Sequence, residues 1–273
     1  MNDRIETQLR AFFGLKALPF LKPPSAEDYL KTASMTRALE RLRYLMDRRG
    51  IGVVFGGPGT GKSTLLRAFM ASLAKTTHAV CYVTHTTCAV LDLYRQIARG
   101  FDLSPRYSRA DVARELKERI EKLSRQSRLE PVLLIDEAHL LPAAFLEELR
   151  LLASFEADSK DELTLVLAGH PQLESNLRLA VNEAFAQRVV LRVRLHCLDR
   201  PEVESYLLFR LELAGRTAKL FLPDAIEAIA KASHGIPRLI DRLCEHAMLL
   251  AVRDHKKEID ADLITQATDE VEP

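Results

Sequence analysis

The fold is decided by the stretch Gly56-Gly57-Pro58-Gly59-Thr60-Gly61-Lys62-Ser63-Thr64. The short apolar run 51–55 before it predicts a buried strand, and apolar residues spaced three and four apart from Leu65 to Leu73 predict an amphipathic helix after it. A strand, a glycine-rich turn and a Gly-Lys-Ser that opens a helix form the context in which a P-loop binds nucleotide phosphates. The alternative is a chance glycine turn, and the two flanking elements weigh against it.

The residues of this P-loop have distinct expected roles. Backbone N–H groups of the turn and the helix N-terminus surround the phosphates. Lys62 reaches the β- and γ-phosphates and the Ser63 hydroxyl holds Mg²⁺, whereas Thr64 supports the helix. The expected nucleotide-binding residues are Gly57, Pro58, Gly59, Thr60, Gly61, Lys62, Ser63 and Thr64.

A second motif, Val132-Leu133-Leu134-Ile135-Asp136-Glu137, places two carboxylates at the end of a predicted strand. In a P-loop sheet, a strand-end aspartate beside the phosphates holds Mg²⁺, so Asp136 joins Ser63 as a metal candidate. Glu137 is then placed to polarise an attacking water. The alternative is that both acids only favour the N-terminus of the next helix, where the dipole attracts negative charge.

The same residues, Asp136-Glu137-Ala138-His139, also spell the signature of a helicase class. That class needs two tandem α/β domains. A chain of 273 residues with a helical tail cannot supply the second domain, so the helicase class is rejected.

The pattern along the chain predicts an α/β fold. Apolar runs at 51–55, 79–84, 131–135, 163–169 and 189–195 alternate with helical patterns, which indicates a parallel five-stranded sheet with helices on both faces. From Pro201 onward only helical patterns occur. The expected division is an N-terminal extended segment packing on the ATPase core (1–34), an α/β domain (35–198) and a small helical lid (199–273).

Composition limits the location and the partners. A hydrophobic content of 47% and a charged content of 28% are ordinary for globular proteins. The net charge of +1 provides no global basic field, so any DNA contact must come from a local patch. The four cysteines show no metal-ligand spacing and are typical of a reducing compartment. With no signal peptide or membrane-length apolar run in the sequence, the expectation is a cytoplasmic protein without membrane contact.

Taken in this order, the motifs resemble those of the AAA+ ATPases, and within them the ExeA-like branch with its TniB, TnsC, IstB and Mu B type transposition ATPases. The resemblance covers nearly the whole chain. The motifs that point to the branch are Phe13-Gly14-Leu15, Pro19-Phe20, Gly169-His170-Pro171-Gln172-Leu173, Gln187-Arg188-Val189 and Gly235-Ile236-Pro237-Arg238. The resemblance implies a Mg²⁺-dependent ATP hydrolase that forms a homo-oligomer, either a hexamer-like ring or a helical filament, with a site shared between subunits.

The resemblance also implies roles for residues outside the P-loop. Arg188 is then an arginine finger that stabilises phosphoryl charge in a neighbouring subunit's site, or alternatively an arginine paired with a surface carboxylate. Arg238 is then the lid arginine at the γ-phosphate, or alternatively a surface arginine near a helix cap. His170 stands where the superfamily often places a γ-phosphate sensor, although a structural hydrogen bond is an equal alternative. Independently of the resemblance, Pro19 and Phe20 either wall the adenine or pack onto the core.

Two functions compete at this point. In the first, the protein assembles on duplex DNA with ATP and recruits or activates a transposase. In the second, it serves a secretion or envelope-assembly complex, as the longer ExeA-like proteins do with a transmembrane segment and a cell-wall-binding region beyond the lid. The sequence ends at Pro273 with neither, which favours the first expectation, and loader or switch roles remain a third. Expected DNA contacts are His85, Thr86, Thr87, Arg106, Ser108 and Arg109, on loops facing the ring axis.

Overall fold

The computed structural model describes residues 3–21, 25–104, 108–154 and 162–271. The chain divides into two compact units, an α/β unit of residues 33–195 and a helical unit that joins residues 1–32 to residues 196–273. Within the described ranges, every helix is too short or too polar to cross a bilayer. All four cysteines are free thiols.

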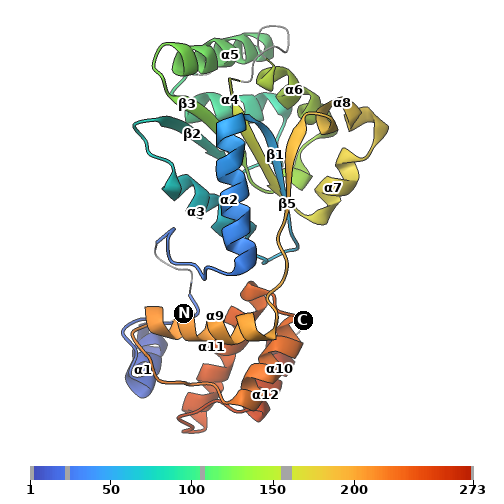
Figure 1. Cartoon of the computed structure of the whole chain (residues 1–273). Coiled ribbons are helices and arrows are strands. Elements are labelled where there is room, and N and C mark those ends of the chain that lie inside the picture. Colours follow the sequence, from blue (N-terminus) through green and yellow to red (C-terminus); the bar gives the residue numbers. More distant parts are fainter. Residues whose placement is uncertain (1–2, 22–24, 105–107, 155–161, 272–273) are drawn as a thin grey trace. The chain divides into compact units, whose positions relative to one another are not determined.

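The α/β unit is built on a five-stranded parallel sheet (Figure 1). Its strands are β1 (Gly50–Phe55), β2 (His78–Val83), β3 (Glu130–Ile135), β4 (Thr164–Gly169) and β5 (Val189–Arg194). The predicted fold class is therefore confirmed, with one strand at each of the five apolar runs. The strand order is β2-β3-β4-β1-β5, so β4 separates the P-loop strand β1 from the carboxylate strand β3. Because all strands are parallel, both motifs lie at the same carboxyl edge of the sheet, where ligands bind in open α/β sheets.

Helices cover both faces of this sheet (Figure 1). One face packs against α2 (Ala33–Arg48) and α3 (Lys62–Ser72), and the other against α4 (Val90–Gly100), α5 (Arg109–Arg125) and α6 (Ala143–Ala153). On β1, Ile51 and Val53 point to the α4 side, as the two-residue strand period requires. Gly52 faces α2, and a Cβ there would lie 2.5 Å from a methyl carbon of Leu45, so glycine permits this close packing. Shorter elements are η1 (Ala138–Leu140), α7 (Pro171–Leu177), η3 (Ala180–Asn182) and α8 (Glu183–Ala186).

The helical unit contains α1 (Asp3–Phe13), α9 (Arg200–Leu213), α10 (Pro223–Ser233), α11 (Pro237–Arg253) and α12 (Ala261–Val271). Prolines occupy the first turns of α9, α10 and α11, where the missing N–H costs nothing. The N-terminal segment differs from the expectation of an extended strip on the ATPase core. Residues 3–13 are helical, and Leu9, Phe13 and Phe20 lie in the core of the helical unit. Leu9 and Phe13 are four residues apart and so form one buried helix face, a pattern that the nearby prolines obscured.

Hydrogen bonds from Arg210 hold residues 19–21 in place within the helical unit. This buried guanidinium donates from Nε to the Pro19 carbonyl (2.6 Å), from Nη2 to the Leu21 carbonyl, and from Nη1 to the Tyr206 hydroxyl (2.6 Å) and the Asp241 carboxylate (3.1 Å). Burial raises the pKa of Asp241 to about 6, and the Arg210 charge opposes this rise.

We therefore expect Arg210→Ala to destabilise the protein by about 3–5 kcal/mol, because it removes a buried guanidinium that pairs with the half-buried Asp241 carboxylate and donates to two carbonyls. Asp241 then keeps the Tyr206 hydroxyl, at 2.9 Å, as a donor. Without Arg210 the pKa of Asp241 rises further. A carboxyl group whose pKa is higher in the folded than in the unfolded state lowers the stability of the protein as the pH rises through the folded-state pKa. The loss of stability caused by Arg210→Ala should therefore be larger at about pH 8 than at about pH 5. Urea unfolding at the two pH values measures the loss of stability and its pH dependence. Arg200→Ala is the control, because its ion pairs with Glu204 and Glu227 lie at the surface, where such pairs contribute little to stability. Equal losses in the two variants would contradict the assignment.

Candidate nucleotide site

The P-loop curls around the buried side chain of Lys62. Its Nζ donates to the carbonyls of Gly56 and Gly57, both at 3.0 Å, and the Thr60 hydroxyl donates to the Gly57 carbonyl at 2.9 Å. Gly61 caps α3 with a φ of 102°, a conformation that side-chain-bearing residues rarely adopt. The Lys62 ammonium has three donors and lies beside a helix N-terminus. It can therefore donate its hydrogen bonds to phosphate oxygens in place of the two carbonyls.

Asp136 lies at the end of β3 with 3% of its surface exposed. One carboxylate oxygen accepts the Glu137 backbone N–H at 2.9 Å, and the other accepts the Tyr82 hydroxyl at 3.0 Å. Burial, followed by the Asp136 charge, raises the pKa of Tyr82, so the phenol stays a proton donor at neutral pH. Sequence reasoning did not find Tyr82. The available signal was its place near the end of β2, which neighbours β3 in the sheet.

Removing the Tyr82 hydroxyl tests whether this residue positions Asp136. If Asp136 holds Mg²⁺ during ATP hydrolysis, as the sequence predicts, Tyr82→Phe should weaken the apparent Mg²⁺ affinity by about 10-fold, because partners of metal ligands typically contribute 10- to 100-fold. The measurement is a Mg²⁺ titration of hydrolysis at saturating ATP. Tyr44→Phe, on the exposed side of α2, is the control and should titrate like the unmodified protein. An unchanged Mg²⁺ dependence in Tyr82→Phe would exclude a positioning role.

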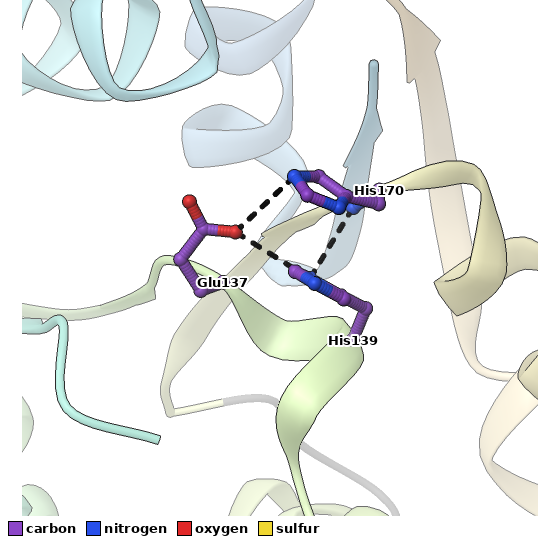
Figure 2. Close-up of side chains that lie close together, drawn as sticks. All are labelled: Glu137, His139 and His170. Atoms are coloured by element: carbon purple, nitrogen blue, oxygen red, sulfur yellow. Dashed lines mark hydrogen bonds and ion pairs between the residues drawn. The ribbon is translucent and has the colours of Figure 1, made fainter. Parts of the chain in front are cut away.

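Glu137 follows Asp136 in a left-handed conformation, with a φ of 50°. Figure 2 shows its carboxylate facing two imidazoles: Oε2 lies 3.5 Å from Nδ1 of His139 and 3.6 Å from Nε2 of His170. The two rings are stacked, with centroids 3.9 Å apart. The structure thus brings His170, from the end of β4, beside Glu137 at the carboxyl edge of the sheet.

The loop after β2 supports Glu137 from the other side. The hydroxyl of Thr86 donates to the Glu137 carbonyl at 3.1 Å, and Thr86 is only 1% exposed. The burial of Thr86 and the internal use of its hydroxyl weigh against the predicted DNA contact of this residue. His85 and Thr87 on either side are exposed.

The other predicted DNA residues have different surroundings. Ser108 is exposed before α5, whereas Arg109 donates to the Glu148 carboxylate, which also accepts the Tyr94 hydroxyl at 2.8 Å. An ion pair of this kind reduces the charge that Arg109 offers to a phosphate. Arg106 lies outside the described residues.

The remaining predicted site residues are divided between the two units. Arg188 follows α8 in the α/β unit, is half-buried, and donates from Nη1 to the Ser154 hydroxyl at 2.6 Å. Pro19, Phe20 and Arg238 belong to the helical unit. The Phe20 ring is buried there against Phe221, with centroids 5.9 Å apart, so packing accounts for this aromatic side chain.

Comparisons with known proteins fit this geometry. The AAA domain family matches residues 43–177. General secretion pathway protein A of Aeromonas hydrophila is 35% identical over 247 residues, which are 88% of this chain and 44% of that protein. The ATP-dependent target DNA activator B of Escherichia phage Mu is 28% identical over 180 residues, 64% of this chain and 52% of that protein. The chain thus spans about half the length of these curated relatives.

Solved structures show the same fold. Cdc6p from Pyrobaculum aerophilum superimposes with a TM-score of 0.73 at 22% identity, covering 93% of this chain and 70% of that chain. The ORC1 protein of Aeropyrum pernix, solved in complex with DNA, has a TM-score of 0.67 at 19% identity, covering 93% of this chain and 69% of that chain. With its P-loop, its strand-end acids and these relatives, the chain belongs to the AAA+ P-loop ATPase family, in the branch related to General secretion pathway protein A and the phage Mu activator B.

Proposed function

We propose that the protein is a Mg²⁺-dependent ATPase that assembles on duplex DNA when ATP is bound and then recruits or activates a transposase. The observation that supports the ATPase part is the convergence of Lys62, Asp136 and Glu137 at one sheet edge. The relation to a phage protein described as an ATP-dependent target DNA activator supports the DNA part. We place this activity in the cytoplasm.

The described side chains suit the parts of an ATP hydrolysis site. Lys62 would bind the phosphate oxygens, and the hydroxyl of the exposed Ser63 with the Asp136 carboxylate would hold Mg²⁺. These are the hard oxygen ligands that Mg²⁺ prefers, and each Asp136 oxygen has an acceptor site beyond its one observed hydrogen bond. Bound Mg²⁺ supplies charge neutralisation of the phosphates. Glu137 would accept a proton from the attacking water.

Assembly would complete this site. Arg188 from a neighbouring subunit would act as the arginine finger, and Arg238 would respond to the γ-phosphate from the helical unit. A guanidinium supplied in this way stabilises charge on the transferring phosphoryl group and makes hydrolysis depend on the oligomer. We propose a ring or filament of identical subunits for this reason.

A second candidate is an ATPase of a secretion or envelope-assembly complex. The relation to General secretion pathway protein A, at 35% identity over 88% of this chain, favours it. Both candidates use the same ATPase site, so they differ in whether the assembled protein holds DNA.

Duplex DNA binding separates the two candidates. We expect labelled duplex to bind with a non-hydrolysable ATP analogue and not with ADP, and the affinity to fall by more than about 10-fold between roughly 50 and 200 mM salt. Fluorescence anisotropy measures both dependences. His85→Ala and Thr87→Ala should weaken binding, whereas Arg114→Ala, on the exposed face of α5, is the matched control. Absent or salt-insensitive binding would favour the secretion candidate.

A further inference from the structure

We propose that Glu137, His139 and His170 form a binding site for a divalent transition-metal ion of the Zn²⁺ class, distinct from the Mg²⁺ position at Ser63 and Asp136 (Figure 2). The bound ion would inhibit ATP hydrolysis by holding the Glu137 carboxylate. The inhibitory part rests on the proposed ATPase function, whereas metal binding itself does not.

Spacing is the first support for this site. The Glu137 Oε2 atom lies 3.5 Å from His139 Nδ1 and 3.6 Å from His170 Nε2. These distances exceed the 2.7–3.2 Å of ordinary hydrogen bonds. Zinc bonds of about 2.0–2.1 Å to nitrogen and oxygen put adjacent ligand atoms of a tetrahedral ion about 3.3–3.4 Å apart. The observed gaps are close to the size that an ion would fill.

Hydrogen bonding is the second, independent support. The Oε2 atom of Glu137 is buried and finds no hydrogen-bond donor among the residues that the structure describes. The backbone N–H of His170 lies 3.4 Å from His139 Nδ1, so this contact is also longer than an ordinary hydrogen bond and leaves the Nδ1 lone pair weakly used. A cation beside Oε2 and Nδ1 would give both atoms a strong partner. A buried acceptor without a donor is the kind of group that an unseen ion often satisfies.

The backbone holds the three ligands while leaving one ring adjustable. Glu137 caps η1, His139 lies within η1, and His170 directly follows β4. The stacked rings differ by only 20° in plane, so one ring must rotate before both nitrogens point at the same ion. His170 has the room to do so, because its side chain is 30% exposed and that of His139 is 12% exposed.

The donor set selects the class of metal. Two imidazoles and one carboxylate suit zinc and similar transition metals, whereas Mg²⁺ and Ca²⁺ prefer all-oxygen ligands. Three protein ligands leave a fourth tetrahedral position for water. An ion held here would keep Glu137 from accepting a proton from the nucleophilic water.

Cobalt(II) is the direct probe, because tetrahedral Co²⁺ absorbs visible light and zinc displaces it. We expect one Co²⁺ per chain, without the charge-transfer bands of thiolate ligands. His139→Ala and His170→Ala should each weaken binding by at least about 100-fold, since even partners of metal ligands contribute 10- to 100-fold. His246→Ala is the matched control, because that histidine also lies beside a carboxylate, Glu270 at 3.7 Å, but in the helical unit. Thiolate bands, or unchanged binding in both site variants, would overturn the proposal.

A second measurement separates this site from the proposed function. With MgATP, buffered Zn²⁺ should inhibit the unmodified protein and His246→Ala alike, and His139→Ala should need at least about 10-fold more zinc for the same fractional inhibition. Cobalt binding without any ATPase activity would leave the metal site standing and remove the proposed function. ATPase activity without cobalt binding would remove the site alone, and binding without inhibition would remove the inhibitory role.

Discussion

Glu137→Gln is expected to lower ATP turnover by about 10²- to 10⁴-fold while ATP binding persists. The substitution keeps the size of the side chain and removes the basic carboxylate that accepts a proton from water. The P-loop contacts of Lys62 do not involve Glu137, so the phosphate site remains intact. Steady-state hydrolysis gives the turnover, and titration with a fluorescent ATP analogue gives the affinity.

Glu130→Gln is the control for this prediction. Glu130 lies on the same strand, β3, at the end opposite the proposed site, where it is 4.0 Å from Arg49. Its turnover should stay within about twofold of the unmodified protein, as for most surface substitutions. A Glu137→Gln variant that hydrolyses ATP at the normal rate would show that another group activates the water.

The sequence predicts the P-loop and the two acids well, because their chemistry depends on short local spacing. Lys62 and Ser63 are fixed by the turn that precedes them, and Asp136 by the strand that ends there. The five strands were also predictable, since each is a continuous apolar run. The apolar runs alone do not predict the order of the strands in the sheet, because β4 pairs with both β1 and β3 across long separations in sequence.

Residues that act through long-range contacts escaped sequence reasoning. Tyr82 and Asp136 meet only because β2 and β3 are neighbours in the sheet. Thr86 looked like a loop residue open to DNA, but its hydroxyl bonds to the Glu137 carbonyl across the same edge. The pairing of His139 with His170 likewise needs η1 and the end of β4 to meet. In each case the missing information was which strand ends adjoin.

Mixing two inactive variants is expected to restore ATP hydrolysis, because the proposed site takes Lys62 from one subunit and Arg188 from the next. Lys62→Ala and Arg188→Ala should each be nearly inactive alone, since an arginine finger contributes about 10³- to 10⁵-fold. In an oligomer assembled at random from equal amounts of the two variants, an interface is intact when its P-loop comes from an Arg188→Ala subunit and its arginine finger comes from a Lys62→Ala subunit. Each condition has a probability of about one half, so about a quarter of the head-to-tail interfaces should work.

The double variant, Lys62→Ala with Arg188→Ala, supplies the control. Mixed with Arg188→Ala it contributes no finger, so no interface is complete and no activity should return. Ser154→Ala tests the structural alternative, because Arg188 donates to the Ser154 hydroxyl within its own chain. If Arg188 acts in the neighbouring site, Ser154→Ala should stay largely active; a loss of activity in Ser154→Ala as large as that in Arg188→Ala would favour a local structural role for Arg188. Failure of the mixture at every ratio, with both variants folded and assembled, would show that each site is complete within one chain.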